Sequence, residues 1–539
     1  MGRGASLNRR ELLLAASSSA LVGCSREPAA VEGGWTGASS DRGHRLRDGA
    51  SLAPSVQRRA GVVIVGAGIA GLSVARSLMR AGIDDFALLD LEDAPGGNSR
   101  GHAIGGIACP LGAHYLPVPG PQAREVAEWL HELGLARHEL GRTVYDERHL
   151  CHSPQERLFI DGHWQDGLLP AAAPGTPTHT QYRRFAVLVA RAQRELGFAM
   201  PTSRAPWTPQ HDALDAQTFA HWLDGQGLDD ARLRWYLDYC CRDDYGAGCG
   251  QVSAWAGLHY FASRHGFHAP GDDEAEREPV LTWPEGNAWL VQHLAAPLRE
   301  RWQGGRVALR VDEARHEVSV DVWDAKTQRV ERWGAKHAVL ALPLFIAARL
   351  LRSPPPALVE TASRQRHAPW LVANLRLNVP LTDRPGAPPS WDNVLYRSPG
   401  LGYVDAQHQS LNPVRGATVL SAYWALDVAQ RRALLEQPWS TWAQRVIDDL
   451  AAAHPDLPRK VKRAELMRYG HAMSIPLPGL RGSAALRALG EPQPGRVHFA
   501  HSDLAGYSVF EEAFTWGATV GERAARRVRG DGGLKPTLR

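Results

Sequence analysis

Apolar residues along the chain follow two spacings, the continuous runs of buried strands and the three-to-four-residue repeat of helices. An apolar run at 61–65 is followed by a glycine-rich turn and by helical spacing to about Ala81, which predicts a strand, a tight turn and a helix. Further helices are predicted at 121–135, 180–196, 440–453 and 514–528, and further strands at 86–90, 307–311, 338–342, 370–377 and 417–425. Strands that alternate with helices predict an α/β protein, and the length of 539 residues predicts more than one domain.

The turn after the first strand carries three glycines at a defined spacing. Gly66 permits the tight turn, Gly68 lets the backbone approach a pyrophosphate, and Gly71 lets the helix pack closely on the strand. The helix start at Ile69 and Ala70 then points backbone N–H groups toward the phosphates. Because a strand precedes the turn and a helix follows it, we expect a dinucleotide to bind here.

Three further segments define the kind of dinucleotide. Asp90 ends the second strand about 20 residues past the glycine loop, where a carboxylate can bind a ribose diol. Gly96 and Gly97 follow it, and segments 110–115 and 495–513 come later. These segments resemble the FAD-binding signature and closing motif of the flavin amine oxidase superfamily, which also includes protoporphyrinogen oxidases and phytoene desaturases.

The resemblance implies FAD as the cofactor and a fold of two interleaved domains. A Rossmann-like FAD-binding domain would be assembled from the discontinuous segments 60–125, 280–350 and 465–530. An α+β substrate domain would be built from the insertions 126–279 and 351–464.

The resemblance also assigns the residues expected to contact FAD. Gly97 and Asn98 would lie at the pyrophosphate, Val311 at the adenine, and Asp503 at the ribityl and phosphate part. Val509 would precede a helix whose positive end stabilises the reduced flavin at its pyrimidine. The segment expected along the flavin ring is Gly112, Ala113, His114 and Tyr115.

The chain departs from the family pattern at three places. Asn98 stands where the family has a pyrophosphate-binding arginine, with Arg100 close by in the sequence. Asp503 comes one position late in the closing motif, after His501 and Ser502. Many amine oxidases hold a lysine beside flavin N5, but the corresponding stretch, 372–380, has none.

In this superfamily the flavin accepts a hydride equivalent from a C–H bond next to nitrogen or to an unsaturated carbon. We therefore expect oxidation of a small-molecule amine. Desaturase-like or protoporphyrinogen oxidase-like oxidation is one alternative, and a non-catalytic flavin-binding lipoprotein is another. No side chain need form a covalent intermediate, and the candidates beside the reacting atoms are His114, Tyr115 and Tyr507.

Other polar residues have weaker assignments. Asp243, Asp244 and Tyr245 could bind a cationic substrate, since paired carboxylates suit an amine, but a solvated helix end is the preferred interpretation. Tyr469 and His471 could shape the pocket, but packed core residues are the preferred interpretation.

Composition excludes other classes of function. Basic and acidic residues, 61 and 57 in number, are spread along the chain with a net charge of +4, which gives no basic patch for nucleic acid. Only five of the basic residues are lysines, so each can be located and excluded from the stretch 372–380. Six cysteines without Cys-x-x-Cys spacing predict neither a zinc site nor a disulfide framework, although a Cys241–Cys249 bridge stays open.

Residues 1–24 predict export. The adjacent Arg9 and Arg10 before a short apolar run resemble a twin-arginine signal, and 21–24 resembles a lipoprotein box that ends in a lipidated Cys24. Residues 25–59, rich in Gly, Ser, Ala, Pro and Arg, predict a flexible tether. We expect a protein exported folded by the twin-arginine machinery and lipid-anchored on the periplasmic side, at the outer membrane. Folding before export would allow FAD to be loaded in the cytoplasm.

Overall fold

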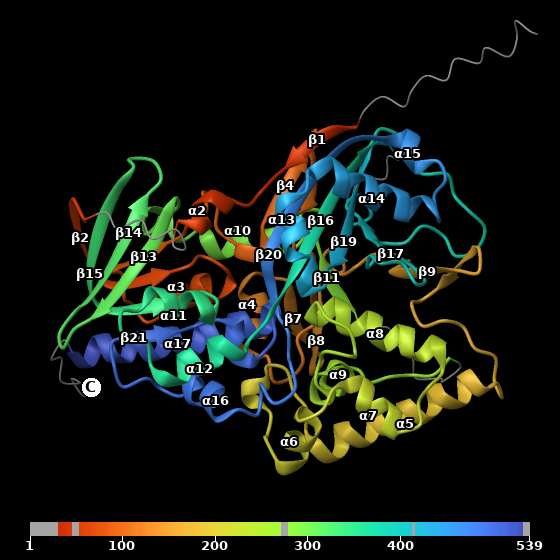
Figure 1. Cartoon of the computed structure of the whole chain (residues 1–539), viewed down its shortest axis with the longest axis horizontal. Helices are drawn as coiled ribbons and strands as arrows, with labels where there is room; N and C mark the ends of the chain where they lie inside the picture. Colours follow the sequence, from red (N-terminus) through yellow and green to blue (C-terminus); the bar gives the residue numbers. More distant parts are fainter. Residues whose placement is uncertain (1–30, 46–52, 271–278, 412–415, 532–539) are drawn as a thin grey trace, which may run out of the picture.

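Two sheets organise the molecule, a computed structural model that describes residues 31–45, 53–270, 279–411 and 416–531 (Figure 1). In the first sheet, parallel and antiparallel strands run in the order β12-β3-β2-β15-β14-β13, with β21 beside β15. Their bounds are β12 (Trp302–Gln303), β3 (Phe86–Leu89), β2 (Val56–Val65), β15 (Arg329–Leu340), β14 (Val318–Asp324), β13 (Arg306–Glu313) and β21 (Val497–Phe499). The glycine loop therefore follows a central strand, β2, of a Rossmann-like sheet.

Two helices pack face to face against this sheet. They are α3 (Ile69–Arg80), which follows the glycine loop, and α17 (Phe510–Asp531), which ends the described chain. A Cβ at Gly517 would meet the Ala70 carbonyl oxygen at 2.3 Å, so the absence of a side chain allows this close approach. The Ser73 hydroxyl also donates to the Phe514 carbonyl, at 2.7 Å. The closing helix is thus seated directly on the helix expected to face the pyrophosphate.

The second sheet has eight strands in the order β1-β20-β16-β19-β18-β17-β9-β10. Their bounds are β1 (Glu32–Trp35), β20 (Val461–Ser474), β16 (His367–Leu377), β19 (Thr418–Ala425), β18 (Tyr403–Asp405), β17 (Asp392–Leu395), β9 (Glu156–Ile160) and β10 (His163–Asp166). Helices from the first insertion gather beside it (Figure 1): α5 (Pro177–Leu196), α6 (Pro209–Asp215), α7 (Phe219–Gly225), α8 (Ala231–Tyr245) and α9 (Ala254–Ala262).

The predicted elements are present with small changes at their ends. The predicted helices correspond to α4 (Arg124–Glu132), α5, α14 (Trp439–Ala451) and α17. One predicted domain boundary is wrong: segment 465–474 does not join the FAD-binding domain, because it is part of β20 in the second sheet. β20 is 14 residues long and pairs with β16 along most of that length, which places it in the other domain.

The predicted flexible tether is also wrong for part of its length. Glu32–Trp35 forms β1, which pairs in parallel with Arg463–Leu466 of β20, and Val56–Arg59 already belongs to β2. Between them lies α2 (Ser40–His44). We call residues 31–45 the N-terminal strap, because they run from the second sheet to the loop that follows β3. Cys24 and the predicted export signal lie outside the described residues.

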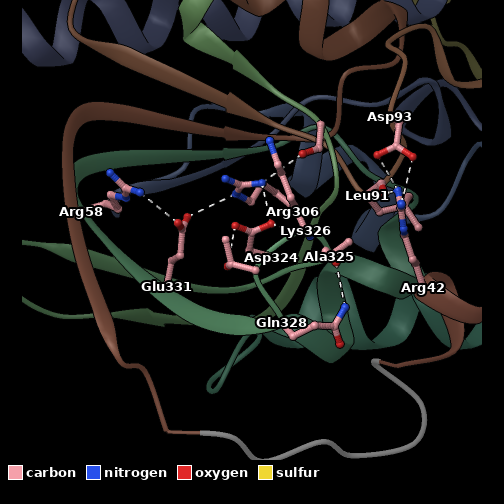
Figure 2. A network of polar contacts seen from close by, with 12 residues as sticks. Arg42, Arg58, Leu91, Asp93, Arg306, Asp324, Ala325, Lys326, Gln328 and Glu331 are labelled. Atoms are coloured by element: carbon pink, nitrogen blue, oxygen red, sulfur yellow. Dashed lines mark hydrogen bonds and ion pairs between the residues drawn. The ribbon is translucent and has the colours of Figure 1, made fainter.

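Polar contacts fasten the strap to the loop after Asp90. Ser39 donates from its backbone N and its hydroxyl to the Glu92 carboxylate, at 3.0 and 2.8 Å. Arg42 donates to the Leu91 carbonyl at 2.9 Å and pairs with Asp93 (Figure 2). The strap therefore contacts the same loop that carries the predicted ribose and pyrophosphate residues.

Charged side chains also join the strands of the first sheet. Figure 2 shows Arg306 of β13 between Asp324 of β14 and Glu331 of β15, with N–O distances of 3.0 and 3.3 Å. Arg58 of β2 approaches the same Glu331 at 3.2 Å. Four strands thus share one network, and Asp324 and Glu331 are almost completely buried in it.

Segment 110–115, expected along the flavin ring, is held by hydrogen bonds to six consecutive backbone carbonyls. Three donors come from the second sheet: Asn374 Nδ2 on Pro110, the Tyr469 hydroxyl on Leu111 and the Tyr423 hydroxyl on Gly112, at 2.9, 3.0 and 3.1 Å. The distances are those of well-formed hydrogen bonds.

The other three donors come from the chain at 282–287. The Asn287 backbone N donates to Ala113, the Thr282 hydroxyl to His114 and Asn287 Nδ2 to Tyr115, at 3.0, 2.7 and 2.9 Å. Segment 110–115 is therefore fixed from both sides, by residues separated from it by up to 358 positions in the sequence.

The described cysteines are free thiols. The sulfur atoms of Cys241 and Cys249 lie 3.9 Å apart, and both residues are buried. Within the described ranges, no helix has the length and apolar character needed to cross a membrane.

Replacing Asn374 by Ala tests how far the hydrogen bonds to segment 110–115 stabilise the protein. The change leaves the buried Pro110 carbonyl and the Ser421 hydroxyl, which donates to Asn374 Oδ1 at 2.5 Å, without their partners. We expect the free energy of unfolding to fall by about 2–3 kcal/mol, measured as a lower melting temperature of the holoprotein. Gln444→Ala, which removes an exposed hydrogen bond to Asp448, is the control and should melt like the parent. Equal melting temperatures of the two variants would contradict a stabilising role for the Asn374 hydrogen bonds.

Candidate active site

The glycine loop has the geometry of a phosphate site. Gly66 has a φ of +102°, and a Cβ at Gly71 would lie 1.8 Å from the Gly66 carbonyl oxygen, so the helix meets the loop only because both residues lack side chains. The first turn of α3 has no acidic residue and no side-chain cap at Gly68. Its backbone N–H groups, from Ile69 and Ala70 onward, are therefore suited to an anion.

The second glycine pair lies directly opposite. The Gly96 backbone N donates to the Ala67 carbonyl at 2.7 Å, and a Cβ at Gly97 would come within 3.2 Å of the Gly68 Cα. Side chains at Gly68 and Gly97 would close the space between the two loops. A pyrophosphate lying along this pair fits the observed backbone.

Asp90 is buried at the end of β3, as expected for the ribose residue. Its Oδ2 accepts from the Ala67 backbone N and its Oδ1 from the Glu92 backbone N, at 2.5 and 2.8 Å. Burial raises the pKa of this carboxyl group to about 6, while the two N–H donors oppose that shift. The carboxylate thus ties the glycine loop to the loop where the strap is bound.

Neither candidate for the missing arginine is aimed at the glycine loop. Asn98 donates through Nδ2 to the Ala472 carbonyl at 2.7 Å, and its own carbonyl accepts from Ala113. Arg100 donates to the carbonyls of Gly37 and Gly97 and lies 3.4 Å from Glu92. The structure therefore uses Asn98 to join β20 to segment 110–115, and Arg100 to hold the strap.

The expected role of Asp503 does not match its surroundings. Its Oδ2 accepts from the Leu344 backbone N at 2.9 Å, both oxygens lie 3.1 Å from His367 Nε2, and His501 Nδ1 lies 3.2 Å from Oδ1. Burial alone would raise its pKa, but the two imidazoles hold the pKa well below its usual range. This fully buried carboxylate is occupied by protein donors from β16 and from α11 (Leu344–Leu350), and its contact with the ribityl part of FAD stays a prediction. Ser502 occupies the preceding position.

The other two predicted contacts are placed at the expected elements. Val311 is buried in β13, and its carbonyl already accepts from the Arg352 backbone N at 3.0 Å. Val509 is half-buried directly before α17, and its carbonyl accepts from Ala513 in the first turn.

Aromatic rings surround the side chain of His114. Its ring stacks on Tyr423 with centroids 4.3 Å apart, and it contacts Tyr115 and Trp391 at 5.1 and 5.4 Å. Burial lowers the pKa of His114 to about 3, so the imidazole is neutral at pH 7. His114 contributes an apolar wall and no positive charge.

Carboxylates lie on the other side of Tyr115. The Tyr115 hydroxyl is 3.4 Å from Asp243 Oδ2, at the carboxyl end of α8. Burial, together with the neighbouring Asp244, raises the pKa of Asp243 to about 7. Burial also raises the pKa of Asp392 on β17, and the nearby Asp243 and Glu156 add to that shift. Asp243 and Asp392 therefore form an acidic site next to the aromatic rings.

Asp244 has a different role from its neighbour. It pairs with Arg264 at 2.9 Å, and both side chains are at least nine-tenths buried. The alternative of a solvated helix end is therefore wrong for this residue, and only Asp243 of the predicted pair faces the aromatic group.

Several members of the site were missed from the sequence. Asp392 and Tyr423 belong to strands of the second insertion, and Trp391 directly precedes β17. Trp391 and Tyr423 meet His114 only through the folded sheet. Asn374 lies in the stretch that lacks the family lysine, where its amide supports Pro110. Tyr469 likewise supports segment 110–115, whereas His471 packs on Phe345 with centroids 5.0 Å apart. Tyr507 lies in a separate buried polar group on the closing loop.

Comparison with known proteins places this site in a family. A family model described as flavin containing amine oxidoreductase matches residues 69–529. An L-amino acid dehydrogenase of Synechocystis sp. is 24% identical over 489 residues, covering 87% of this chain and 94% of that protein. A putrescine oxidase of Kocuria rosea is 30% identical over 177 residues, which is 32% of each chain.

Solved structures share the fold. Cyclohexylamine oxidase from Brevibacterium oxydans superposes with a TM-score of 0.65 at 17% identity, covering 87% of this chain and 99% of that one. Putrescine oxidase bound to putrescine gives 0.63 at 17% identity, with 88% and 100% covered. The family match spans most of the chain, and the two glycine loops and the buried Asp90 fit FAD. The chain belongs to the flavin containing amine oxidoreductase family and is a FAD-dependent oxidoreductase.

Proposed function

We propose that this flavoenzyme oxidises a small amine, which binds as its ammonium ion between the aromatic rings and the carboxylates of Asp243 and Asp392. The observation that carries the proposal is the acidic site beside Tyr115 and His114. Burial and the nearby Asp243 raise the pKa of Asp392, and a bound cation relieves that repulsion. Aromatic faces add a favourable interaction with an ammonium group.

The chain's own residues would bind and orient the substrate. When bound, FAD supplies a hydride acceptor for the C–H bond next to nitrogen. Asp243 and Asp392 would hold the charged end, and the rings of His114, Tyr423 and Trp391 would exclude water from the reacting carbon. Each backbone carbonyl of segment 110–115 accepts a hydrogen bond, and these bonds would hold Tyr115 and His114 in fixed positions.

An amino acid is a poorer fit to these groups. The L-amino acid dehydrogenase similarity covers most of the chain, but an amino acid brings a carboxylate as well as an ammonium group. Carboxylates at Asp243 and Asp392 repel that second charge. We therefore favour amines without a carboxylate.

Anaerobic mixing of the holoprotein with candidate substrates tests this function. We expect primary amines and diamines to bleach the flavin absorption band, because hydride transfer reduces the flavin, and we expect the corresponding amino acids to bleach it at least ten times more slowly. The measurement is stopped-flow absorbance of the flavin. Bleaching by amino acids but not by amines would reverse the substrate class, and bleaching by neither would overturn amine oxidation.

The pH dependence of substrate affinity tests the role of Asp243. Its raised pKa means that the carboxyl group is neutral below about pH 7 and charged above it. We expect the KM for an amine to rise as the pH falls through 7, with kcat changing less. Asp243→Asn should raise KM about tenfold at pH 8, equivalent to about 1.4 kcal/mol, and flatten the profile. Asp448→Asn, on an exposed helix face, is the control; a KM profile for Asp243→Asn that matches this control would remove Asp243 from the site.

We also propose that the protein is exported and lipid-anchored through Cys24, which is supported by the arginine pair and the lipoprotein box at 1–24. In the bacterial cell, Cys24→Ala should move the protein from the membrane pellet to the soluble periplasmic fraction, because the acyl chains are lost. Incorporation of labelled palmitate into the parent chain is the direct measurement. A Cys24→Ala variant that still sediments with membranes would contradict the anchor.

A further inference from the structure

A buried chain of hydrogen-bonding side chains begins in the first turn of α17. Glu512 Oε1 accepts from the Tyr507 hydroxyl at 3.1 Å and from the Thr202 backbone N at 2.6 Å. The Tyr507 oxygen in turn lies 2.9 Å from His259 Nε2 on α9. Since Tyr507 donates its proton to Glu512, the contact with His259 requires a proton on Nε2, and Nδ1 is then an acceptor. These side chains are at most 2% exposed.

A second histidine continues the chain toward the surface. His211 Nδ1 on α6 accepts from the Thr208 backbone N at 3.1 Å and lies 2.9 Å from the Thr208 hydroxyl. Nδ1 is therefore an acceptor, and the neutral ring carries its proton on Nε2. Thr208 is only half-buried, and Pro209 beside it is exposed.

The two histidines present complementary atoms without protein partners. His259 Nδ1 and His211 Nε2 are buried and have no hydrogen-bond partner among the described residues. One atom is an acceptor and the other a donor, and Phe198 contacts both rings, with centroids 5.9 and 5.2 Å away. An unpaired buried polar atom is costly, so we expect one water between the two rings that accepts from His211 and donates to His259.

The inner end of the chain is separated by one aromatic ring from the helix that carries Asp243. Tyr507 packs edge-on against Tyr245, with centroids 5.5 Å apart. Tyr245 and Asp243 share the last turn of α8, and Asp243 faces Tyr115. Glu512 is three residues past Val509, at the helix end expected to face the flavin pyrimidine.

We propose that Glu512, Tyr507, His259 and His211 form a proton path from the buried site to solvent at Thr208. The proposal rests on the proposed function. An ammonium substrate, R–CH2–NH3+, becomes the iminium R–CH=NH2+ by losing one proton and one hydride. The hydride carries two electrons to FAD, which is reduced, and the substrate is oxidised. The remaining proton has to leave the site, and the path carries it to bulk water. This outward transfer uses the opposite tautomers to those at rest, because each imidazole accepts the proton at Nε2 and releases it from Nδ1.

The groups around His259 lower its pKa, so the ring passes a proton on and does not hold it. Burial lowers the pKa of His259 below its usual range, and Arg264, Arg481 and His211 lower it further. Burial also lowers the pKa of His211. Asp212 opposes that shift, and Arg481 adds to it. Both rings are therefore neutral at pH 7, and a neutral imidazole can accept a proton at one nitrogen while it donates from the other. Glu512, whose pKa burial raises, can also exist with its proton.

Two aromatic replacements interrupt the path with little change of shape. His259→Phe keeps a ring stacked on Trp255, and Tyr507→Phe keeps the ring against Tyr245. The matched control is His454→Phe, because His454 also is buried, pairs through Nε2 with a tyrosine hydroxyl (Tyr403, 2.8 Å) and has no described partner at Nδ1, but lies in the second sheet's own core. All three variants should bind FAD with the absorption spectrum of the parent.

Proton movement is measured in the holoenzyme independently of the amine substrate. Reduction of bound FAD by reduced methyl viologen takes two electrons and one proton from solution, and a pH indicator in weak buffer follows that uptake in stopped flow. We expect uptake to keep pace with flavin bleaching in the parent and in His454→Phe. In His259→Phe and Tyr507→Phe it should lag at least tenfold behind. With an amine substrate, the same two variants should show a lower kcat, an unchanged KM and an altered solvent isotope effect.

The outcomes separate the path from the proposed function. If no amine reduces the parent, amine oxidation fails, but a lag confined to the two path variants still supports the path. If both path variants take up protons as fast as His454→Phe, the path is overturned even where amines are oxidised. Should His259→Phe lose FAD, Tyr507→Phe alone decides, because it removes one hydroxyl group and keeps the ring.

Discussion

The site depends on how segment 110–115 is held. Its six carbonyls accept hydrogen bonds from side chains and backbone of both the second sheet and the 282–287 turn. Each bond alone contributes about 1 kcal/mol, but a buried carbonyl left without a partner costs more. The two domains are therefore not free to separate at this point without exposing a row of unsatisfied carbonyls. These hydrogen bonds fix the positions of His114 and Tyr115. The acidic site lies beside those two residues.

Electrostatics divide the interior into regions of different chemistry. Asp503 is surrounded by imidazoles and a helix N–H, which keep it ionised. Asp243 and Asp392 are half-buried near each other, and their neutral forms are favoured instead. The same type of side chain thus serves as an anchor in one place and as a group ready to receive a cation in the other. Burial is common to both, so the difference comes from the neighbours.

Local signals were predicted well from the sequence, and long-range pairings were not. One strand–turn–helix–strand unit contains Gly66, Gly68, Gly71 and Asp90. The residues that such a unit requires lie close together in the sequence, so they can be recognised there. β1 was taken for a tether because its partner in β20 is more than 400 positions away and its four residues carry no apolar pattern. A motif predicts the position of Asp503, but its partners, the Leu344 backbone N and His367, lie more than 130 positions away in the sequence. Asp392 and Tyr423 could not be connected with His114, because only the completed sheet brings them together.

The early start of β1 has a consequence for how an anchored molecule would stand. Only seven residues lie between Cys24 and Glu32, and the eight extended steps that join the two Cα atoms span at most about 28 Å. A lipid on Cys24 would therefore hold the β1 edge of the second sheet close to the bilayer surface. From that edge the strap passes directly to Glu92 and Leu91, which belong to the loop of the nucleotide site. The segment next to the anchor would then be hydrogen-bonded to the loop that follows Asp90 in the nucleotide site.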